Sequence, residues 1–479
     1  MDGIRSSRAS GPWAAAATAA LLLLALAMIA FPRPAQALPS FARQTGQPCG
    51  FCHTDMPGLT PAGRRFKLGG YTLGGGEFRT TPFPSSSEPA SSGSGKDDKG
   101  WFPPVAMMTI VGLTHTQAPL PPPTAPFQAN DNVIASPVSG FYAGAITEHV
   151  GAFAQVTHDN PPGTWTWDNV DVRYANSAKF GSLDVLYGIT ANNNPTVQDV
   201  WNTTPAWGFP YATSTIAPTP AAHTIIDGTF AARVGSTGGY VFINDALYLE
   251  ATAYKTLDPG AQTHLGVDPF GAPGLFGSLS PYWRVAFEPH IGNHWLEIGT
   301  FGMFSEIHPW IDPSGLSGFG TFPQTDKFTD VGVDTQYQYQ GDNYWFTLRG
   351  SYIHEHQKRD ASFANGLSAN LTDTLNTARA QASLAYGADN RIVLTGQYFN
   401  TWGSPDAGLY GALASGFSPN SNGWVAEIAY IPFMSSKAPL WPWSNVRVGL
   451  QYTWYNKFDG TRVGASANNT LFLYAWFAM

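Results

Sequence analysis

The sequence predicts an all-β protein, a transmembrane β-barrel of about sixteen antiparallel strands, and three observations support this. Charged residues make up only 12% of the chain and aromatic residues 14%, whereas soluble proteins are about 25% charged. After Phe31, no uninterrupted apolar run reaches the roughly 18 residues that a membrane helix needs. Polar and apolar residues instead alternate along many short segments, which is the pattern of barrel strands.

The alternation has a period of two and is clearest between Asp330 and Gln340. Odd positions there are mainly aliphatic or aromatic, and even positions are polar or glycine. The same pattern recurs across residues 377–386 and 445–454. A strand with one apolar and one polar face fits a barrel that faces lipid outside and water inside. The competing fold is a soluble two-sheet sandwich, for which so few charges would be unusual.

Strand-like segments extend from residue 104 to residue 479, and their connections alternate between short and long. We expect the second strand at 139–148, and the sixth at 223–235 joined to the seventh, 239–254, by a turn from Gly235 to Gly239. The expected long connections are rich in Pro, Gly and Asn and comprise 117–138, 192–222, 255–281, 305–325, 356–374 and 401–422. Short turns on one rim, with both chain ends beside them, are the plan of outer-membrane barrels. The connection 433–443 is an exception, because it is long yet falls on the short-turn side.

Four parts follow one another along the chain. Residues 1–37 are expected to be a signal peptide, because Arg5 and Arg8 precede an apolar run that ends in a small-x-small cleavage site; a retained membrane anchor is the alternative. Residues 38–80 form a segment too short to bury a large core alone. Residues 81–100 are a flexible linker rich in Ser and Gly. Residues 101–479 form the barrel.

The segment 38–80 contains the stretch Cys49-Gly50-Phe51-Cys52-His53, with the only two cysteines of the chain. Two thiols that add to porphyrin vinyl groups, with a histidine directly behind them, are what covalent haem attachment needs. We therefore predict one covalent haem c on Cys49 and Cys52, with His53 as the metal ligand. The alternatives are a redox dithiol and a partial zinc site, although a structural zinc site needs four ligands. Met56 follows His53 too closely to reach the other side of the ring, so the sixth iron ligand is open.

The residues around this stretch form a longer motif. Phe41-Ala42-Arg43-Gln44-Thr45-Gly46 precedes it, and Leu59-Thr60-Pro61-Ala62-Gly63-Arg64-Arg65-Phe66-Lys67-Leu68-Gly69-Gly70-Tyr71 follows it. The motif resembles the outer-membrane fused monohaem cytochrome–porins of iron-oxidising bacteria, over about forty residues. This resemblance implies Fe(II) as electron donor, a periplasmic c-type cytochrome or copper protein as acceptor, and the outer membrane of a Gram-negative cell as location.

Other polar side chains are weaker candidates for a function. Arg43, Arg64, Arg65 and Lys67 are expected either to pair with haem propionates or to form a solvated basic face. His354 and His356 share one strand face and either hold a metal or line a loop entrance. Inward-facing carboxylates serve either Fe(II) transit or the ordinary polar lumen of a porin, and comprise Asp171, Glu250, Glu288, Glu297, Asp330, Asp334 and Glu427.

The leading hypothesis is an outer-membrane electron-transfer oxidoreductase that oxidises extracellular Fe(II) and passes electrons, through a haem held by the barrel, to a periplasmic carrier. The haem segment is expected inside the barrel or on its periplasmic side. A passive diffusion porin with a haem-bearing plug and an electron-exporting conduit are the alternatives. No hydrolase triad, phosphate-binding loop, nucleotide fingerprint or zincin motif is present. The net charge of −8 argues against nucleic acid as a partner. The predicted barrel implies that membrane lipid surrounds the protein.

Overall fold

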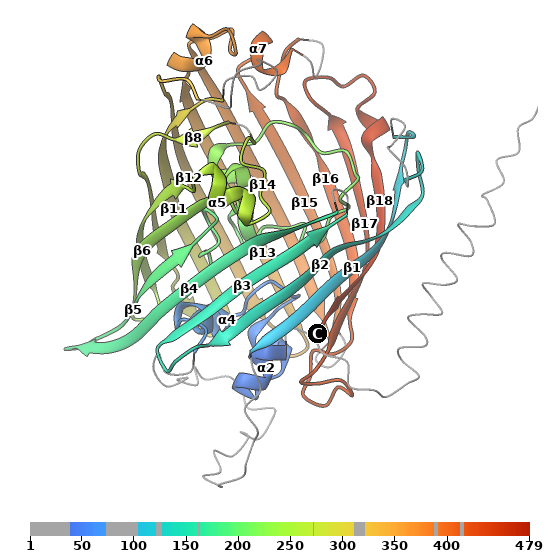
Figure 1. Ribbon diagram of the computed structural model, residues 1–479. Helices are drawn as coiled ribbons and strands as arrows, with labels where there is room; N and C mark the ends of the chain where they lie inside the picture. The colour runs from blue at the N-terminus through green and yellow to red at the C-terminus, as the bar shows by residue number, and fades with distance from the viewer. Residues whose placement is uncertain are drawn as a thin grey trace, which may run out of the picture.

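The computed structural model describes residues 39–72, 104–120, 127–160, 163–271, 273–310, 321–387, 391–411 and 416–479. The expected signal peptide, 1–37, and linker, 81–100, lie outside the described residues. The described chain forms one barrel with a small helical segment inside one end (Figure 1). Within these ranges, no helix is long and apolar enough to cross a membrane.

The described strands form one antiparallel sheet of eighteen, of which β8 (Leu275–Phe276) and β10 (His290–Ile291) are two-residue pieces beside β11. The barrel wall consists of β1 (Val105–Thr116), β2 (Asn132–Ala145), β3 (Val150–Asp159), β4 (Thr164–Phe180), β5 (Leu183–Asn192), β6 (Val234–Ile243), β7 (Leu247–Thr256), β9 (Ser280–Phe287), β11 (His294–His308), β12 (Asp326–Gln340), β13 (Tyr344–Lys358), β14 (Thr372–Tyr386), β15 (Arg391–Gly403), β16 (Ser421–Ile431), β17 (Asn445–Lys457) and β18 (Thr470–Ala478). The first and last of these strands pair, from Met108 opposite Ala478 to Thr116 opposite Thr470, and close the sheet. The predicted barrel of about sixteen antiparallel strands is confirmed.

The two ends of the barrel differ in their connections. Short turns such as 181–182, 244–246 and 341–343 lie at one end, together with the start of β1 and the end of β18. Long loops lie at the other end and carry the short helices α6 (Asp360–Ala364) and α7 (Ala407–Tyr410), which cap the top of the barrel in Figure 1. A third helix, α5 (Pro259–His264), belongs to the long connection between β7 and β9. We call these the short-turn end and the long-loop end.

The predicted sixth strand at 223–235 is wrong. Residues Ile225–Thr229 form a short helical turn, η2, and β6 begins only at Val234. The glycines of the expected turn lie within β6, where they allow close strand pairing: a Cβ on Gly238 would overlap Thr252 of β7. A run of glycines therefore marks close backbone approach here and not a turn.

The predicted start of the second strand at 139 is also wrong, because β2 begins at Asn132. Pro137 interrupts the strand pattern in the sequence, since proline cannot donate to a sheet. In the structure it lies at a register shift between β1 and β2, where Thr109 pairs with Val138 but Val111 pairs with Ala135. The bulge accommodates the proline and lets the strand continue.

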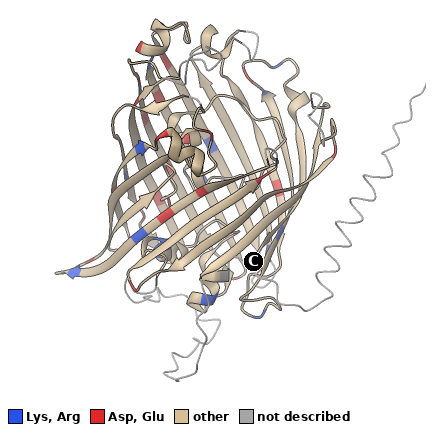
Figure 2. Cartoon of the chain, in the orientation of Figure 1, with Lys and Arg blue, Asp and Glu red and all other residues tan. Residues whose placement is uncertain are grey.

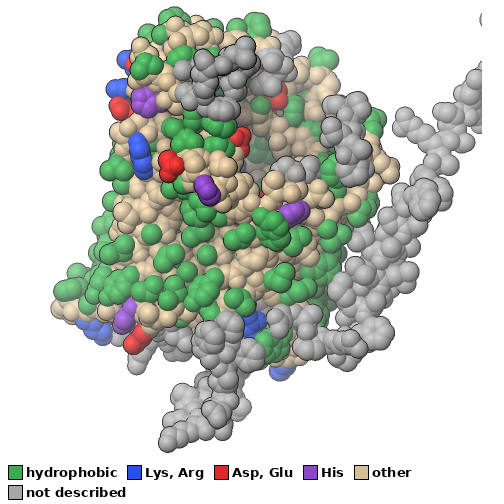
Figure 3. All heavy atoms as spheres, viewed as in Figure 1, with side chains coloured by type: hydrophobic (Ala, Val, Ile, Leu, Met, Phe, Trp, Pro, Cys, Tyr) green, Lys and Arg blue, Asp and Glu red, His purple; other side chains and the backbone are tan. Residues whose placement is uncertain are grey.

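The outer face of the barrel is apolar between two aromatic zones. Tyr344 and Tyr386 lie exposed near the short-turn end, and Tyr352 and Trp424 near the long-loop end. Tyr344 and Tyr352 share the outer face of β13 and are about 26 Å apart along the strand. Hydrophobic side chains gather over the outer wall on the face seen in Figure 3, and charged residues are sparse on the wall in Figure 2. Barrels that span a membrane carry such a band, about 25 Å tall.

Two inserts occupy the lumen. The first comprises residues 39–72, with helices α2 (Pro39–Thr45), α3 (Cys49–Cys52) and α4 (Pro61–Leu68) at the short-turn end. Because it contains the predicted attachment residues, we call it the haem segment. The second is the connection between β5 and β6, residues 193–233, which we call the lumen loop. Its residues Ile225, Ile226 and Phe230 are buried against inward-facing side chains of β9, β11, β12 and β13. The lumen loop runs longer than the expected connection 192–222.

Two loops of the long-loop end are joined by one carboxylate, which belongs to Asp406 before α7. Its oxygens accept hydrogen bonds from the backbone N–H groups of Gly408, Leu409, Ala369 and Asn370, at 2.7 to 3.0 Å. Burial alone would raise its pKa, but these hydrogen bonds bring the pKa down to about 2. The carboxylate thus joins the 359–371 loop to the 404–420 loop.

Because the folded pKa of Asp406 lies below that of an unfolded aspartate, its stabilisation is present above about pH 4 and is lost as pH falls through about 2. We expect the amides of residues 368–370 and 407–409 to stay protected from hydrogen exchange down to about pH 3. Asp406→Asn should remove this protection at all pH values, since hydrogen bonds to a charged acceptor contribute about 1.5–3 kcal/mol each. Equal protection in Asp406→Asn and the native chain, after correction for intrinsic exchange, would contradict the assignment.

Candidate functional site

The predicted haem-attachment residues lie on α3 and its C-terminal cap. This single helical turn places Cys49 and Cys52 three residues apart on one face. The N–H of His53 donates to the Cys49 carbonyl at 2.9 Å and closes the turn. His53 then continues in an extended conformation and forms an antiparallel bridge with Leu59. The two sulfurs and the imidazole are thereby held on adjoining parts of one tight structure.

The His53 ring is oriented by a backbone carbonyl. Its Nδ1 lies 3.2 Å from the carbonyl oxygen of Pro57. When Nδ1 donates this hydrogen bond, Nε2 carries the lone pair and can ligate a metal. This is the arrangement that histidine ligands of metals generally show, in which the second ring nitrogen bonds to a carbonyl or carboxylate.

The Thr60-Pro61-Ala62-Gly63 stretch attaches α4 to the cysteine turn. Thr60 caps α4 by accepting from the Gly63 N–H at 3.2 Å, and its hydroxyl donates to the Phe51 carbonyl at 2.6 Å. Pro61 occupies the first helical position, where its missing N–H costs nothing. Gly63 faces the Cys52 carbonyl oxygen so closely that a Cβ would overlap it. These residue types therefore allow α4 to cross the cysteine turn at close range.

Two guanidinium groups of the barrel wall hold the loop that carries His53. Arg391 of β15 donates to the carbonyls of His53, at 2.7 Å, and Thr54, at 2.6 Å. Arg447 of β17 donates to the carbonyls of Asp55 and Met56 and pairs with Glu427. Both arginines are buried. Four consecutive carbonyls of the segment are thus bound by side chains of the wall.

Helix α4 binds the haem segment to another part of the wall and to the lumen loop. Arg64 pairs with Glu288 and donates to Gln338 at 2.7 Å. Lys67 donates to the carbonyls of Val197, at 2.6 Å, and Asp199, at 2.7 Å, in the lumen loop. Burial, with Arg173 close by, lowers the pKa of Lys67 to about 7. The segment therefore spans the lumen, with contacts to the wall on both sides.

An apolar patch lines the lumen beside Cys49, although barrel lumens are generally polar. It consists of buried inward-facing residues at the short-turn ends of five strands together with Met434, and Cys49 and Met56 pack against it; its members are Trp295, Trp345, Ala385, Val393, Ala429, Ile431 and Met434. Further along the same strands the inward positions become polar, for example Gln381 and Glu427. The lumen is apolar just where the segment presents its cysteines.

These features fit a covalent haem. Both thiols are free of disulfide, and the side chains of Cys49, Cys52 and His53 each keep some accessible surface although the segment lies within the barrel. A porphyrin is a large apolar group, and an aromatic and aliphatic wall beside the attachment residues offers it a matching surface. Cys49 and Cys52 would hold the group covalently, and His53 Nε2 would ligate its iron.

The four basic residues of the segment do not form a solvated basic face, because they bind the protein itself. Arg43 donates to the Val105 carbonyl at 2.7 Å and lies over the Trp443 ring. Arg65 pairs with Asp245 in the turn between β6 and β7. Arg64 and Lys67 bind the wall and the lumen loop as described above. Their function in this structure is to dock the segment.

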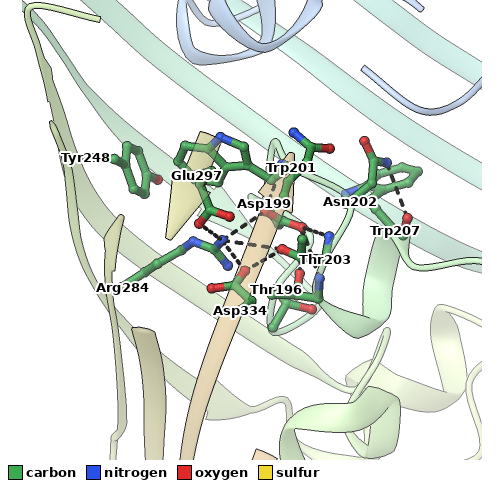
Figure 4. Close-up of polar contacts among 12 residues, drawn as sticks. Thr196, Asp199, Trp201, Asn202, Thr203, Trp207, Tyr248, Arg284, Glu297 and Asp334 are labelled. Carbon is green, nitrogen blue, oxygen red and sulfur yellow. Dashed lines mark hydrogen bonds and ion pairs between the residues drawn. The ribbon is translucent and has the colours of Figure 1, made fainter. Parts of the chain in front are cut away.

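The lumen loop is bound to the wall through Arg284 of β9, shown in Figure 4. This guanidinium contacts Asp334 at 2.5 Å, Glu297 at 3.4 Å and Asp199 of the lumen loop at 3.6 Å. Asp199 also accepts from the backbone N–H groups of Trp201 and Thr203, at 3.0 and 3.1 Å. All three carboxylates are buried. The loop that contacts Lys67 on one side is thus fastened to the wall on the other.

The predicted inward carboxylates do face the lumen, and all seven are buried. Most of them are paired: Asp171 with Arg173, Glu288 with Arg64, Glu427 with Arg447, and Glu297 and Asp334 with Arg284. Among the described residues, no group of three or more His, Cys, Asp or Glu side chains is arranged to hold a metal ion. The ion pairs thus engage five of the seven predicted carboxylates.

The histidine pair at 354 and 356 does not line the lumen. Both side chains lie on the outer face of β13, where His354 Nδ1 contacts the Asn376 amide oxygen at 2.8 Å. Sequence reasoning also missed four contributors to the site: the lumen loop, Arg391, Arg447 and the apolar patch. A signal for the patch exists in the sequence, since inward positions at the short-turn ends of neighbouring strands are apolar. Pairing of these strands is needed to see that they adjoin.

Comparisons with known proteins complete the description. No family model and none of the curated proteins compared match this chain. Among solved structures, OmpT of Vibrio cholerae is 8% identical with a TM-score of 0.40, and covers 78% of this chain and 96% of its own. OprB of Pseudomonas putida is 11% identical, with a TM-score of 0.41 and coverage of 78% and 93%.

A third similar structure is the outer-membrane channel DcaP of Acinetobacter baumannii, which is 12% identical, with a TM-score of 0.41, and covers 78% of this chain and 96% of its own. Identities this low and TM-scores below 0.5 leave the function to be argued from the site itself.

Proposed function

We propose that the chain is an outer-membrane electron-transfer cytochrome, with one haem c on Cys49 and Cys52 and His53 as iron ligand. It takes electrons from extracellular Fe(II) and passes them to a periplasmic c-type cytochrome or copper protein. The observation that carries this proposal is the position of the Cys49 to His53 stretch, inside a barrel and beside an apolar patch of the lumen. The Fe(II) donor and the acceptors come from the resemblance of the surrounding motif.

A location in the outer membrane is supported by the outer wall. Aliphatic side chains cover it between two aromatic zones, and a closed barrel pairs every strand, which a lipid environment requires. Short turns face the periplasm in barrels of this class. The haem segment then lies at the periplasmic end of the lumen, where a soluble carrier can approach it.

The haem, when bound, supplies a centre that accepts and releases one electron at a time. The residues of the chain would hold this group and orient its iron ligand. Cys49 and Cys52 keep the group attached, and the Pro57 carbonyl orients the His53 ring for ligation. Arg391 and Arg447 hold the ligand loop against the wall, which would keep His53 in a fixed position toward the iron. One Fe(II) loses one electron and leaves as Fe(III), and the periplasmic carrier later removes that electron.

A passive porin with a haem-bearing plug is the second candidate, because the barrel is wide enough to enclose an aqueous channel. The positions of the two inserts argue against this function, since a buried ion pair joins each of them to the wall. An electron-exporting conduit would use the same residues in the opposite direction. Haem attachment, access of electron donors from outside and ion conductance distinguish these functions.

The first prediction concerns attachment. The denatured chain should keep its haem colour on a gel, because thioether bonds survive denaturation. Cys49→Ser and Cys52→Ser should each weaken this attachment, and His53→Ala should reduce haem content further through loss of the iron ligand. Thr45→Ser, in the same segment, is a matched control, because it keeps the hydroxyl that donates to the Phe41 carbonyl. Haem that extracts freely from the native chain into acidic organic solvent would rule out the covalent site.

The second prediction concerns access from outside. The lumen loop lies between the haem segment and the long-loop end, so only a small donor should deliver electrons quickly. Fe(II) should reduce the haem in intact cells, whereas a reduced protein too wide for the lumen should do so at least tenfold more slowly than with detergent-released protein. The measurement is stopped-flow absorbance of both preparations. Equal rates for the wide donor would place the haem outside the lumen, and failure of Fe(II) in both would remove iron as donor.

The third prediction concerns ion flow. In planar bilayers the full chain should conduct far less than an open sixteen-stranded porin, because both inserts are fastened to the wall. The double variant Arg391→Ala, Arg447→Ala should raise the conductance several-fold, because it loosens the haem segment. Arg462→Ala, at an exposed position of a long loop, should leave it unchanged. A steady porin-like conductance of the native chain would instead support passive diffusion.

A further inference from the structure

One connection at the short-turn end is built differently from its neighbours. Residues 432–444, between β16 and β17, extend over the haem segment, whereas the 341–343 turn simply reverses the chain. The Met434 carbonyl accepts from the Gly50 N–H at 2.9 Å, within the haem-attachment stretch. Trp441 Nε1 donates to the Gln47 carbonyl at 3.4 Å. This explains why a long connection occurs on the short-turn side: it holds the haem segment in place. We call residues 432–444 the clasp.

The clasp brings a second methionine to the attachment residues. Met434 is 1% exposed, and Cys49 and Met56 pack against the patch to which it belongs. A Cβ on Gly50 would contact the Met434 carbonyl at 3.1 Å, so the clasp and the cysteine turn lie back to back. Met434 is thus a buried thioether beside the thiols that would carry the haem.

The amide of Asn445 orients both thioethers. Its Nδ2 lies 3.1 Å from Met56 Sδ, 3.7 Å from Met434 Sδ and 3.1 Å from the Phe433 carbonyl. Burial of a polar side chain beside an apolar patch, here at the start of β17, costs free energy unless the side chain is hydrogen-bonded. An amide that donates to a sulfur fixes the direction of that sulfur's lone pairs, as side chains around metal ligands commonly do.

The two methionines differ in which segment holds them. Met56 belongs to the loop of His53, and Arg447 binds its carbonyl at 2.9 Å, so it moves with the proximal ligand. Met434 comes from the connection 432–444, which is far from that loop along the chain. A sixth ligand has to come from the side of the ring opposite His53. A segment other than the His53 loop can meet this condition, and a thioether is an established partner of histidine on haem iron.

We propose that Met434 Sδ is the sixth ligand of the iron, with Asn445 as the residue that positions it. This inference rests on the proposed haem. It makes the iron site a joint product of the two parts of the chain, with His53 from the haem segment and Met434 from the barrel. The ligand set is incomplete unless the barrel has folded around the segment. Thioether ligation raises the reduction potential relative to two histidines.

The test uses the full-length holoprotein and its ferric spectrum. The native protein should show the weak long-wavelength absorption band of sulfur-to-iron charge transfer. Met434→Leu should keep the covalent haem and the folded barrel, lose this band, lower the reduction potential and bind added imidazole at least tenfold faster. Met434→His should also lose the band and lower the potential, but should resist imidazole. Folding of each variant is checked by the heat-dependent gel mobility that closed barrels show.

Met56→Leu is the matched control, because it removes the neighbouring thioether of the same cluster and should leave the band and the potential unchanged. Asn445→Ala should weaken the band without changing haem content. The proposal is overturned if Met434→Leu and Met434→His both retain the native spectrum and potential, or if Met56→Leu abolishes the band. Failure of the proposed function would look different, since the native protein would then contain no covalently bound haem.

Discussion

Closure of the sheet is the constraint on which the rest of the structure depends. β1 pairs with β18 along its length, so no wall strand in the described part of the chain is left with an unpaired edge. Apolar surroundings cannot satisfy free N–H and C=O groups, and a closed barrel is the only way in which strands avoid them. Closure also creates an interior that is separated from the outer face. The Cys49 to His53 stretch and both inserts lie in that interior.

The interior holds more charge than an ordinary protein core. Arg284 lies among Asp199, Asp334 and Glu297, Arg64 beside Glu288, and Arg447 beside Glu427. Desolvation of such groups is expensive, and removal of one partner generally costs more than the pair contributes. The ion pairs therefore contribute little net stability. Instead they fix the positions of the two inserts, which must lie where their charged partners on the wall are. Fixed positions are what an electron-transfer site requires, because the rate depends on distance and on small rearrangement.

The haem segment depends on the barrel for its own fold. A chain of its length buries too little surface to be stable alone. Here Phe66 and Tyr71 pack against β1, β2 and β3, and Cys49 and Met56 against the patch on the other side of the lumen. The inner wall thus serves as the hydrophobic core that the segment lacks. A haem bound there would be enclosed by both parts, and its iron would be ligated from both under the assignment of Met434.

The sequence alone determined the barrel class, because period-two alternation and the spacing of turns are local properties of a chain whose strands pair with their neighbours. It also determined the inward direction of Asp330, Asp334 and Glu427, and the thiol–thiol–imidazole order of the attachment stretch. It misplaced β6, since glycines that allow close pairing and glycines that turn look alike in a sequence. The positions of Arg391, Arg447, Met434 and the lumen loop were decided only by the tertiary structure. These residues are more than a hundred positions away from the haem segment, and only closure of the barrel brings them to one lumen.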